Sequence, residues 1–458
     1  MSHKHGHAVD MCNGPLLPQM IRFAVPLMFS TILQLFFHMA DIIVVGRFAG
    51  DQCMAAVGTT SSLNTLLVNL LIGFSIGANV QAARERGAGK YEDVRRTAHT
   101  AVLIGAFSGV CLMLIGLLGS RQFLIWMEVP ESILDMSTLY LRILFLGRPA
   151  SMVYNAGAAL LRAIGDTGRP LRYLMISGSV NVLLNLMFVI GFGMDVAGVA
   201  IATVISNFVS CTLILRCLMR EDAIQLRLRQ LRIYPDKLQG ILKVGIPASI
   251  QRTLFSIANV MVASSVNSFG ELAVAGNSVS SNIESFTHTA ADAVAQSALS
   301  FTSQNVGAGK WKRVKRVVVT ASACVMVSSA VIAVLSNLLA PTLLGIYTET
   351  EAVIQAGLIR FRLLVSCYAL CGLMKVMQNV LRGAGYSGLS TFVSLVGAFG
   401  VRIMWLLTVF QIPRFHTIRT VYMSFPVTWA ATLAVYLICW LFISRRFREK
   451  AAAQNAET

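Results

Sequence analysis

Apolar runs of about 20 residues or more follow one another along nearly the whole chain, separated by short polar breaks. A helix needs about 20 largely apolar residues to cross a bilayer. Charged residues make up 13% of the 458 residues, against roughly 25% in an ordinary soluble domain. Too few charged side chains are present to cover a soluble globule of this size. We therefore predict a membrane protein with many spans.

The runs define twelve predicted spans, all helical, because none shows the alternating ten-residue pattern of a membrane β-barrel. Their bounds are 19–45, 52–82, 93–119, 132–159, 170–192, 195–219, 238–267, 271–305, 313–340, 351–381, 387–411 and 418–444. The first run carries Asp41 and has no small-residue cleavage site, so we expect it to stay as the first span. The nine cysteines include no CxxC pair, so neither a disulfide framework nor a metal site is expected.

The basic excess follows the predicted loops. Of the 38 Lys and Arg residues, 27 lie at the termini and in every second loop, and four lie in the opposite loops. Basic residues gather on the cytoplasmic side of membrane proteins. We therefore expect a protein of the cell (inner or plasma) membrane with both termini in the cytoplasm. The net charge of +17 then reflects topology, and no nucleic-acid partner is expected.

The two halves of the chain repeat each other. Residues 87–96 read GAGKYEDVRR and residues 307–316 read GAGKWKRVKR, with six identities at an offset of 220. The same offset pairs Gly165 with Gly385 and Arg142 with Arg362. Because six spans separate equivalent loops, both loops lie on one side of the membrane and the repeats are parallel. We predict an all-α membrane protein of two six-helix lobes, with a cavity between them that opens alternately to each side.

This repeat sets the expected domain bounds. They are a cytoplasmic tail at 1–18, an N-terminal lobe at 19–219, a basic linker at 220–237, a C-terminal lobe at 238–444 and a second cytoplasmic tail at 445–458. The GAGK turns are not phosphate-binding loops, because Lys90 precedes Tyr91 and Lys310 precedes Trp311 instead of Ser or Thr. With no nucleotide motif, we expect an ion gradient, and no cofactor, to supply the energy.

Ionisable groups inside a bilayer are costly and are candidates for function. In the N-terminal lobe, Asp41 is the one acid inside a span, and Asn181 and Asn185 lie four apart on one face of the fifth span. Thr203 and Tyr140 add further oxygen atoms. This set suits a Na⁺ site or a carboxylate that gains and loses a proton. The alternative is a buried aspartate that hydrogen-bonds to hydroxyls for packing.

A second polar group lies in the C-terminal lobe. Glu284, His288 and Asp292 follow one another every four residues and form one stripe on the eighth span. The stripe could be a proton relay or a wall that attracts cations. Equally, it could be an internal ion-pair network with Arg252 and Lys375. Pro26 and Pro247 interrupt backbone hydrogen bonding early in the first and seventh spans and allow bends there.

These features resemble the multidrug and toxic compound extrusion (MATE) family over residues 15–444. The matching segments include FAVPLMFSTILQLFFHMADIIVVGRFAG, both GAGK loops, YLRI at 140–143, LRAIGD at 161–166 and GVAIATVIS at 198–206. The resemblance implies a twelve-helix antiporter that exports lipophilic, often cationic organic compounds in exchange for H⁺ or Na⁺. Its partners would be small organic substrates and membrane lipid, and we expect a monomer.

The resemblance also implies site residues. Asp41, Asn181 and Thr203 match a cation site of the N-terminal lobe, Tyr140 and Asn155 match polar residues that line that lobe, and Pro26 matches a bend in the first helix. The sequence departs from the family where many members have a second aspartate, because Asn185 stands there. Phe255 and Cys371 stand where the NorM-type branch has acids of the C-terminal lobe.

Two other functions remain open. A flippase for a lipid-linked saccharide would need an interior rich in arginine, because pyrophosphates bind cations; Arg252 and Lys375 are the clear interior candidates. A membrane-embedded enzyme could use Glu284, His288 and Asp292, although no third His or Cys stands at a spacing that would complete a metal site.

Overall fold

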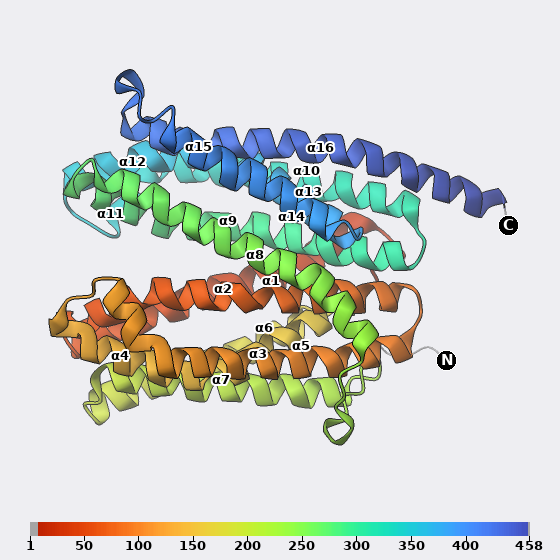
Figure 1. Ribbon diagram of the computed structural model, residues 1–458, viewed down its shortest axis with the longest axis horizontal. Helices are drawn as coiled ribbons and strands as arrows, with labels where there is room; N and C mark the ends of the chain where they lie inside the picture. The colour runs from red at the N-terminus through yellow and green to blue at the C-terminus, as the bar shows by residue number, and fades with distance from the viewer. Residues whose placement is uncertain (1–7, 457–458) are drawn as a thin grey trace. The chain divides into compact units, whose positions relative to one another are not determined.

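The computed structural model describes residues 8–456, and residues 1–7 of the predicted N-terminal tail lie outside that range. Within it the chain forms helices, turns and loops but no strand (Figure 1). This confirms the all-α prediction. The chain divides into two compact units, which we call unit 1 and unit 2. Unit 1 contains the residues up to Val9 and Phe29–Ser249, and unit 2 contains Asp10–Met28 and Ile250–Thr458.

Each unit is a bundle of long helices joined by short turns. In unit 1 these are α2 (Asp51–Gly87), α3 (Tyr91–Trp126), α4 (Glu131–Leu146), α5 (Arg148–Ala163), α6 (Gly168–Leu186) with the π-helical η1 (Met187–Gly191), α7 (Asp195–Arg220) and the short η2 (Leu228–Gln230). In unit 2 these are α9 (Glu271–Gly307), α10 (Trp311–Leu338), α11 (Ala340–Gly345), α12 (Glu351–Ser366), α13 (Tyr368–Gly383), α14 (Ser387–Ser394), the π-helical η3 (Leu395–Gly400), α15 (Val401–Leu407), η4 (Pro413–Phe415) and α16 (Ile418–Ala456).

Two further helices, α1 (Leu16–Phe48) and α8 (Pro235–Asn267), are shared between the units. In each, the change of unit follows a proline by two residues: α1 carries Pro26 and changes after Met28, and α8 carries Pro247 and changes after Ser249. Proline removes a backbone donor from a helix and crowds the preceding turn. Each shared helix therefore lacks one backbone hydrogen bond shortly before it passes from one unit to the other.

Twelve membrane crossings account for these helices. Among the described residues, eight helices are long and apolar enough to span a bilayer, and the pair α12 and α13, bent by 49°, makes a ninth. The other three predicted spans coincide with α4 and α5, with α8 and with α9, which carry more polar residues. Large apolar side chains point outward along the helices, including Leu118 at 83% exposure and Leu338 at 74%. Such surfaces require a hydrocarbon environment.

The internal repeat is visible in the backbone. Gly89 and Gly309, which are 220 residues apart, both adopt positive φ angles, of 73° and 69°. At each turn the next lysine donates its backbone N–H back into the preceding helix, from Lys90 to the Glu85 carbonyl at 3.0 Å and from Lys310 to the Asn305 carbonyl at 2.9 Å. A positive φ favours glycine, so the two GAGK motifs specify the same turn.

Candidate functional site

The predicted polar residues of the N-terminal lobe form a chain of hydrogen bonds inside unit 1. Asn185 on α6 donates to Oδ1 of Asp41 on α1 at 2.5 Å. The same amide nitrogen lies 3.4 Å from Oδ1 of Asn181, and Asn181 donates to the Thr203 hydroxyl on α7 at 3.3 Å. Thr203 in turn donates to the Val199 carbonyl of its own helix at 2.9 Å. The four-residue spacing of the two asparagines places both side chains on the face that meets α1 and α7.

This set of hydrogen-bonded residues contains a carboxylate without a cationic partner. Asp41 forms no ion pair with any other described residue, and the amide of Asn185 is its hydrogen-bond donor. Asn185 is fully buried, and its Oδ1 atom accepts no hydrogen bond in the described structure. A buried oxygen without a donor is costly. The cluster therefore offers hard oxygen atoms, one of them unsatisfied, beside a carboxylate that can take up a proton or a small cation.

The two remaining candidates of the N-terminal lobe lie in the same unit but do not belong to this set of hydrogen-bonded residues. Tyr140 on α4 is buried, and Asn155 on α5 is half-buried. Neither forms a hydrogen bond with the four chain residues in the described structure. The four-residue spacing in the sequence thus identified the two asparagines that hydrogen-bond in the structure. The contribution of Tyr140 and Asn155 to the site stays a prediction.

In unit 2, Glu284 on α9 is buried and bound to an arginine that sequence analysis did not single out. Both carboxylate oxygens accept hydrogen bonds from Arg360 on α12, at 2.9 and 2.8 Å. The third guanidinium nitrogen donates to Oδ1 of Asn277 at 2.8 Å, and the Ser280 hydroxyl donates to Glu284 at 2.9 Å. This geometry neutralises Glu284 within the lobe.

The rest of the stripe is more open. Lys375 on α13 lies 2.5 Å from Asp292, and their side chains are 27% and 49% exposed. The His288 ring packs against the Tyr368 ring with centroids 4.1 Å apart. The structure thus contains the ion pair with Lys375 that the ion-pair network hypothesis expects. Arg252 is exposed and belongs to none of the ion pairs among the described residues, and the cation beside Glu284 is Arg360.

The same position of the repeat carries an arginine contact in each unit. Glu284 is equivalent to Asn64 at the offset of 220, and in unit 1 Arg148 donates to the Asn64 side-chain oxygen. The arginines come from different positions, because Arg360 is equivalent to Tyr140 and Arg148 to Tyr368. Tyrosine and arginine have exchanged places between the repeats. The repeat alignment was the sequence signal that could have identified this exchange.

A charged cluster also secures the linker to unit 1. Lys237 lies 3.0 Å from Glu85 and 2.9 Å from Asp93, and Asp236 adds a third carboxylate at 3.2 Å. Burial by itself would lower the pKa of Lys237, but the hydrogen bonds to Asp93 and Glu85 outweigh it and raise that pKa. The predicted linker therefore ends in a fixed contact with α2 and α3.

The two halves each match one family model. The MatE model matches residues 26–187 and again residues 247–407. The chain belongs to the MatE family. The two matches also confirm the internal repeat inferred from the sequence, since their starts are separated by nearly the same offset.

Similar proteins extend over the whole chain. A probable multidrug resistance protein, YoeA, of Bacillus subtilis is 27% identical over 434 residues, which is 93% of this chain and 93% of that protein. A probable multidrug resistance protein, NorM, of Thermotoga maritima is 25% identical and covers 80% of each chain. The solved structure of a multidrug resistance MATE transporter in an outward-facing conformation aligns with a TM-score of 0.89 at 20% identity, over 96% of this chain and 99% of that one.

Membership in the MatE family makes this chain a multi-pass membrane protein of the multidrug efflux class. The family comprises transporters of small molecules rather than enzymes. This confirms the resemblance to the MATE family and the predicted twelve-helix, two-lobed fold.

Proposed function

We propose that this MatE protein is a secondary active antiporter that exports lipophilic, often cationic organic compounds in exchange for H⁺ or Na⁺, with both termini in the cytoplasm. One observation carries the proposal: Asp41 is a membrane-embedded carboxylate with amide and hydroxyl neighbours but no cationic partner among the described residues. Such a group is stable when an ion or a proton neutralises it. Its charge state can therefore depend on the ion gradient.

Coupling requires that the ion and the substrate prefer different conformations, because a ligand with equal affinity for both shifts nothing. Asp41 lies fifteen residues after Pro26 on α1, the helix that the two units share. The Asn185 contact ties that part of α1 to α6. Loss or gain of charge at Asp41 would change this contact and so bias the position of α1, with Pro26 as the place where the helix yields.

In the C-terminal lobe, we assign a part in transport to Asp292 and Lys375 rather than to Glu284. The Glu284 and Arg360 side chains are 5% and 11% exposed, whereas the Asp292 side chain is 49% exposed. An accessible pair can exchange partners with an ion or a substrate, but a buried bidentate pair cannot do so without a large penalty. Glu284 then serves the packing of the lobe.

The structure offers less to the flippase and enzyme alternatives. Arg360 is held by Glu284 through both carboxylate oxygens, and the 5%-exposed Arg402 lies under the Phe425 ring, so neither is available to a pyrophosphate. Arg252 and Lys375 are then the accessible interior candidates of the described C-terminal lobe, which is not an interior rich in arginine. For an enzyme, His288 and Asp292 would have to share a ligand, but His288 contacts Tyr368 and Asp292 contacts Lys375. The antiporter proposal uses Asp41, the carboxylate that has no cationic partner among the described residues.

Reconstitution into liposomes tests the proposal. A fluorescent lipophilic cation is followed under an imposed H⁺ gradient and, separately, under an imposed Na⁺ gradient. We expect uphill efflux with one of them, and loss of that efflux in Asp41→Asn. Asp135→Asn, at an 89%-exposed side chain, is the matched control and should transport normally. Coupled transport by Asp41→Asn would refute the assignment, and uphill efflux with neither gradient would refute antiport.

A further inference from the structure

The two copies of the GAGK turn and the helix start that follows it differ sharply in charge. Residues 87–96 contain three cations and two carboxylates, whereas residues 307–316 contain five cations and no carboxylate. In unit 1, Glu92 lies 3.6 Å from both Arg95 and Arg96 and balances them. The position equivalent to Glu92 in unit 2 is Lys312. The α10 copy has therefore replaced its counter-ion by a further cation.

Asp10 of unit 2 lies near enough to Lys310 for that cation to help lower the Asp10 pKa, so this carboxylate balances part of the charge of the turn. Arg316, the equivalent of Arg96, is exposed and forms no ion pair with any described residue. Arg313 is held by neutral acceptors, including the Gly14 and Asn13 carbonyls, both at 2.9 Å. Neutral oxygens satisfy the guanidinium geometrically but leave its charge uncancelled. The start of α10 thus presents a concentrated positive charge.

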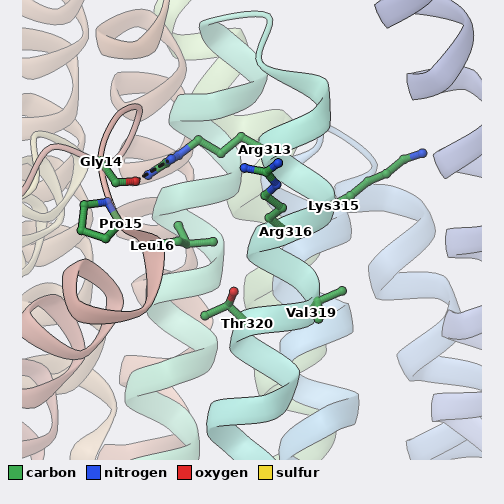
Figure 2. Close-up of a pocket in the computed structure, with 8 residues that line it drawn as sticks. All are labelled: Gly14, Pro15, Leu16, Arg313, Lys315, Arg316, Val319 and Thr320. Carbon is green, nitrogen blue, oxygen red and sulfur yellow. Dashed lines mark hydrogen bonds between the residues drawn. The ribbon is translucent and has the colours of Figure 1, made fainter.

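These cations surround a cavity of about 480 Å³ within unit 2. In Figure 2 the Gly14 carbonyl meets the Arg313 guanidinium on one side, Lys315 points away on the other, and Arg316 lies between them. The cavity also has an apolar part, because its lining includes Pro15, Leu16 and Val319. The cavity therefore has cationic side chains on one part of its surface and apolar side chains on another.

The apolar wall continues down the outside of α10. Val319 is 70% exposed, Val327 is 66% exposed and Leu338 at the end of the helix is 74% exposed. In a bilayer this face lies against acyl chains. The cationic cavity stands at the beginning of that face, so with α10 across a bilayer it would lie at the level of the headgroups of one leaflet.

We propose that this cavity binds the phosphate headgroup of an anionic phospholipid, whose acyl chains lie along the exposed face of α10. Arg316 supplies the positive charge that lacks a protein counter-ion, and the phosphodiester takes the place that Glu92 has in unit 1. Basic pockets at the cytoplasmic ends of spans are suited to such headgroups. The proposal requires only that α10 lies in a membrane, and it is independent of antiport.

A melting titration of the purified full-length protein in detergent tests the proposal. Dioleoyl-phosphatidylglycerol, dioleoyl-phosphatidylcholine and inorganic phosphate are added in parallel. We expect saturable stabilisation by phosphatidylglycerol alone. Equal stabilisation by inorganic phosphate would indicate a soluble anion and overturn the lipid proposal, and equal stabilisation by phosphatidylcholine would overturn the role of charge.

Variants locate the site. Arg316→Gln should weaken the apparent affinity for phosphatidylglycerol by about fivefold, the effect of one surface cation. Arg96→Gln removes the same charge from the equivalent position of unit 1 and should leave the affinity within about twofold. Equal losses in the two variants would show diffuse attraction to anionic lipid and refute a site on α10.

A second variant introduces a counter-ion without removing Arg316. Lys312→Glu places a carboxylate three residues before Lys315 and four before Arg316, the arrangement that Glu92 has in unit 1. Because Lys312 is exposed, folding should be preserved, and this variant serves if Arg316→Gln is unstable. We expect phosphatidylglycerol binding to weaken by at least fivefold, roughly the effect of one cation. Wild-type affinity in this variant would overturn the proposal.

Discussion

The side-chain amide of Asn185 on α6 donates to the carboxylate of Asp41 on α1 at 2.5 Å, and the two residues are 144 positions apart in the sequence. This bond joins the membrane-embedded acid of unit 1 to a chain that continues through Asn181 to Thr203. A hydrogen bond to a charged group is stronger than one between neutral groups. Asn185 is therefore the residue through which the charge of Asp41 acts on α6.

Replacing Asn185 by leucine should impair coupling more than it impairs folding. The change removes the donor to Asp41, and loss of a hydrogen bond to a charged group costs about 1.5–3 kcal/mol. We expect gradient-driven efflux in liposomes to fall roughly tenfold or more. Asn207→Leu is the matched control, because Asn207 is half-buried on α7 and its side chain forms no hydrogen bond with these four residues in the described structure. Equal losses in the two variants would contradict the assignment.

Replacing Glu284 by glutamine should destabilise the protein strongly. The change leaves Arg360 buried without its counter-ion, which costs about 3–5 kcal/mol. Asp292→Asn should cost less than Glu284→Gln, because the Asp292 and Lys375 side chains are more open, at 49% and 27% exposure. Melting temperatures in detergent would compare them. Adding Arg360→Met to Glu284→Gln should restore part of the loss, and a double variant less stable than Glu284→Gln would refute the pairing argument.

Replacing Lys237 by methionine should lower stability by about 3 kcal/mol, because Glu85 then stays buried without a cation. The pKa of Lys237 is raised in the folded protein, so its contribution is complete below its ordinary pKa of about 10.4 and is lost only as pH rises through the higher folded value. Lys237 is charged at both pH 6 and pH 9, but burial raises the pKa of Glu85 and removal of Lys237 raises it further, so the loss of melting temperature should be no larger at pH 6 than at pH 9. Lys243→Met, at an exposed site, should have little effect.

Two glycines of unit 1 should differ in their tolerance of alanine. Gly89 has a φ of 73° and open space around it, so Gly89→Ala adds strain of about 1–2 kcal/mol. Gly165 has a φ of 99°, and an added Cβ would lie 2.4 Å from the Val9 carbonyl oxygen. Gly165→Ala should therefore lower the melting temperature further than Gly89→Ala. The reverse order would show that the contact with Val9 yields easily.

Much of the fold could be predicted because the bilayer imposes a simple rule on the sequence. Runs of about 20 apolar residues mark the spans, and the offset of 220 marks the repeat that the two MatE matches confirm. The breaks inside spans were not predicted. The predicted spans 132–159 and 351–381 are each two helices, broken at Gly147 and Cys367, which are 220 residues apart. Hydropathy does not register a break between two apolar segments.

The sequence by itself determined which polar groups lie within the membrane, because an acid inside an apolar run is conspicuous, and the spacing of Asn181 and Asn185 placed both on one helical face. Only the tertiary structure decided the partners. Glu284 pairs with Arg360 on α12 and Asp292 with Lys375 on α13, while Asp41 has an amide and no cation. Spacing fixes neighbours along one helix, but contacts between helices depend on how the helices pack. That packing leaves Asp41 without a cationic partner among the described residues.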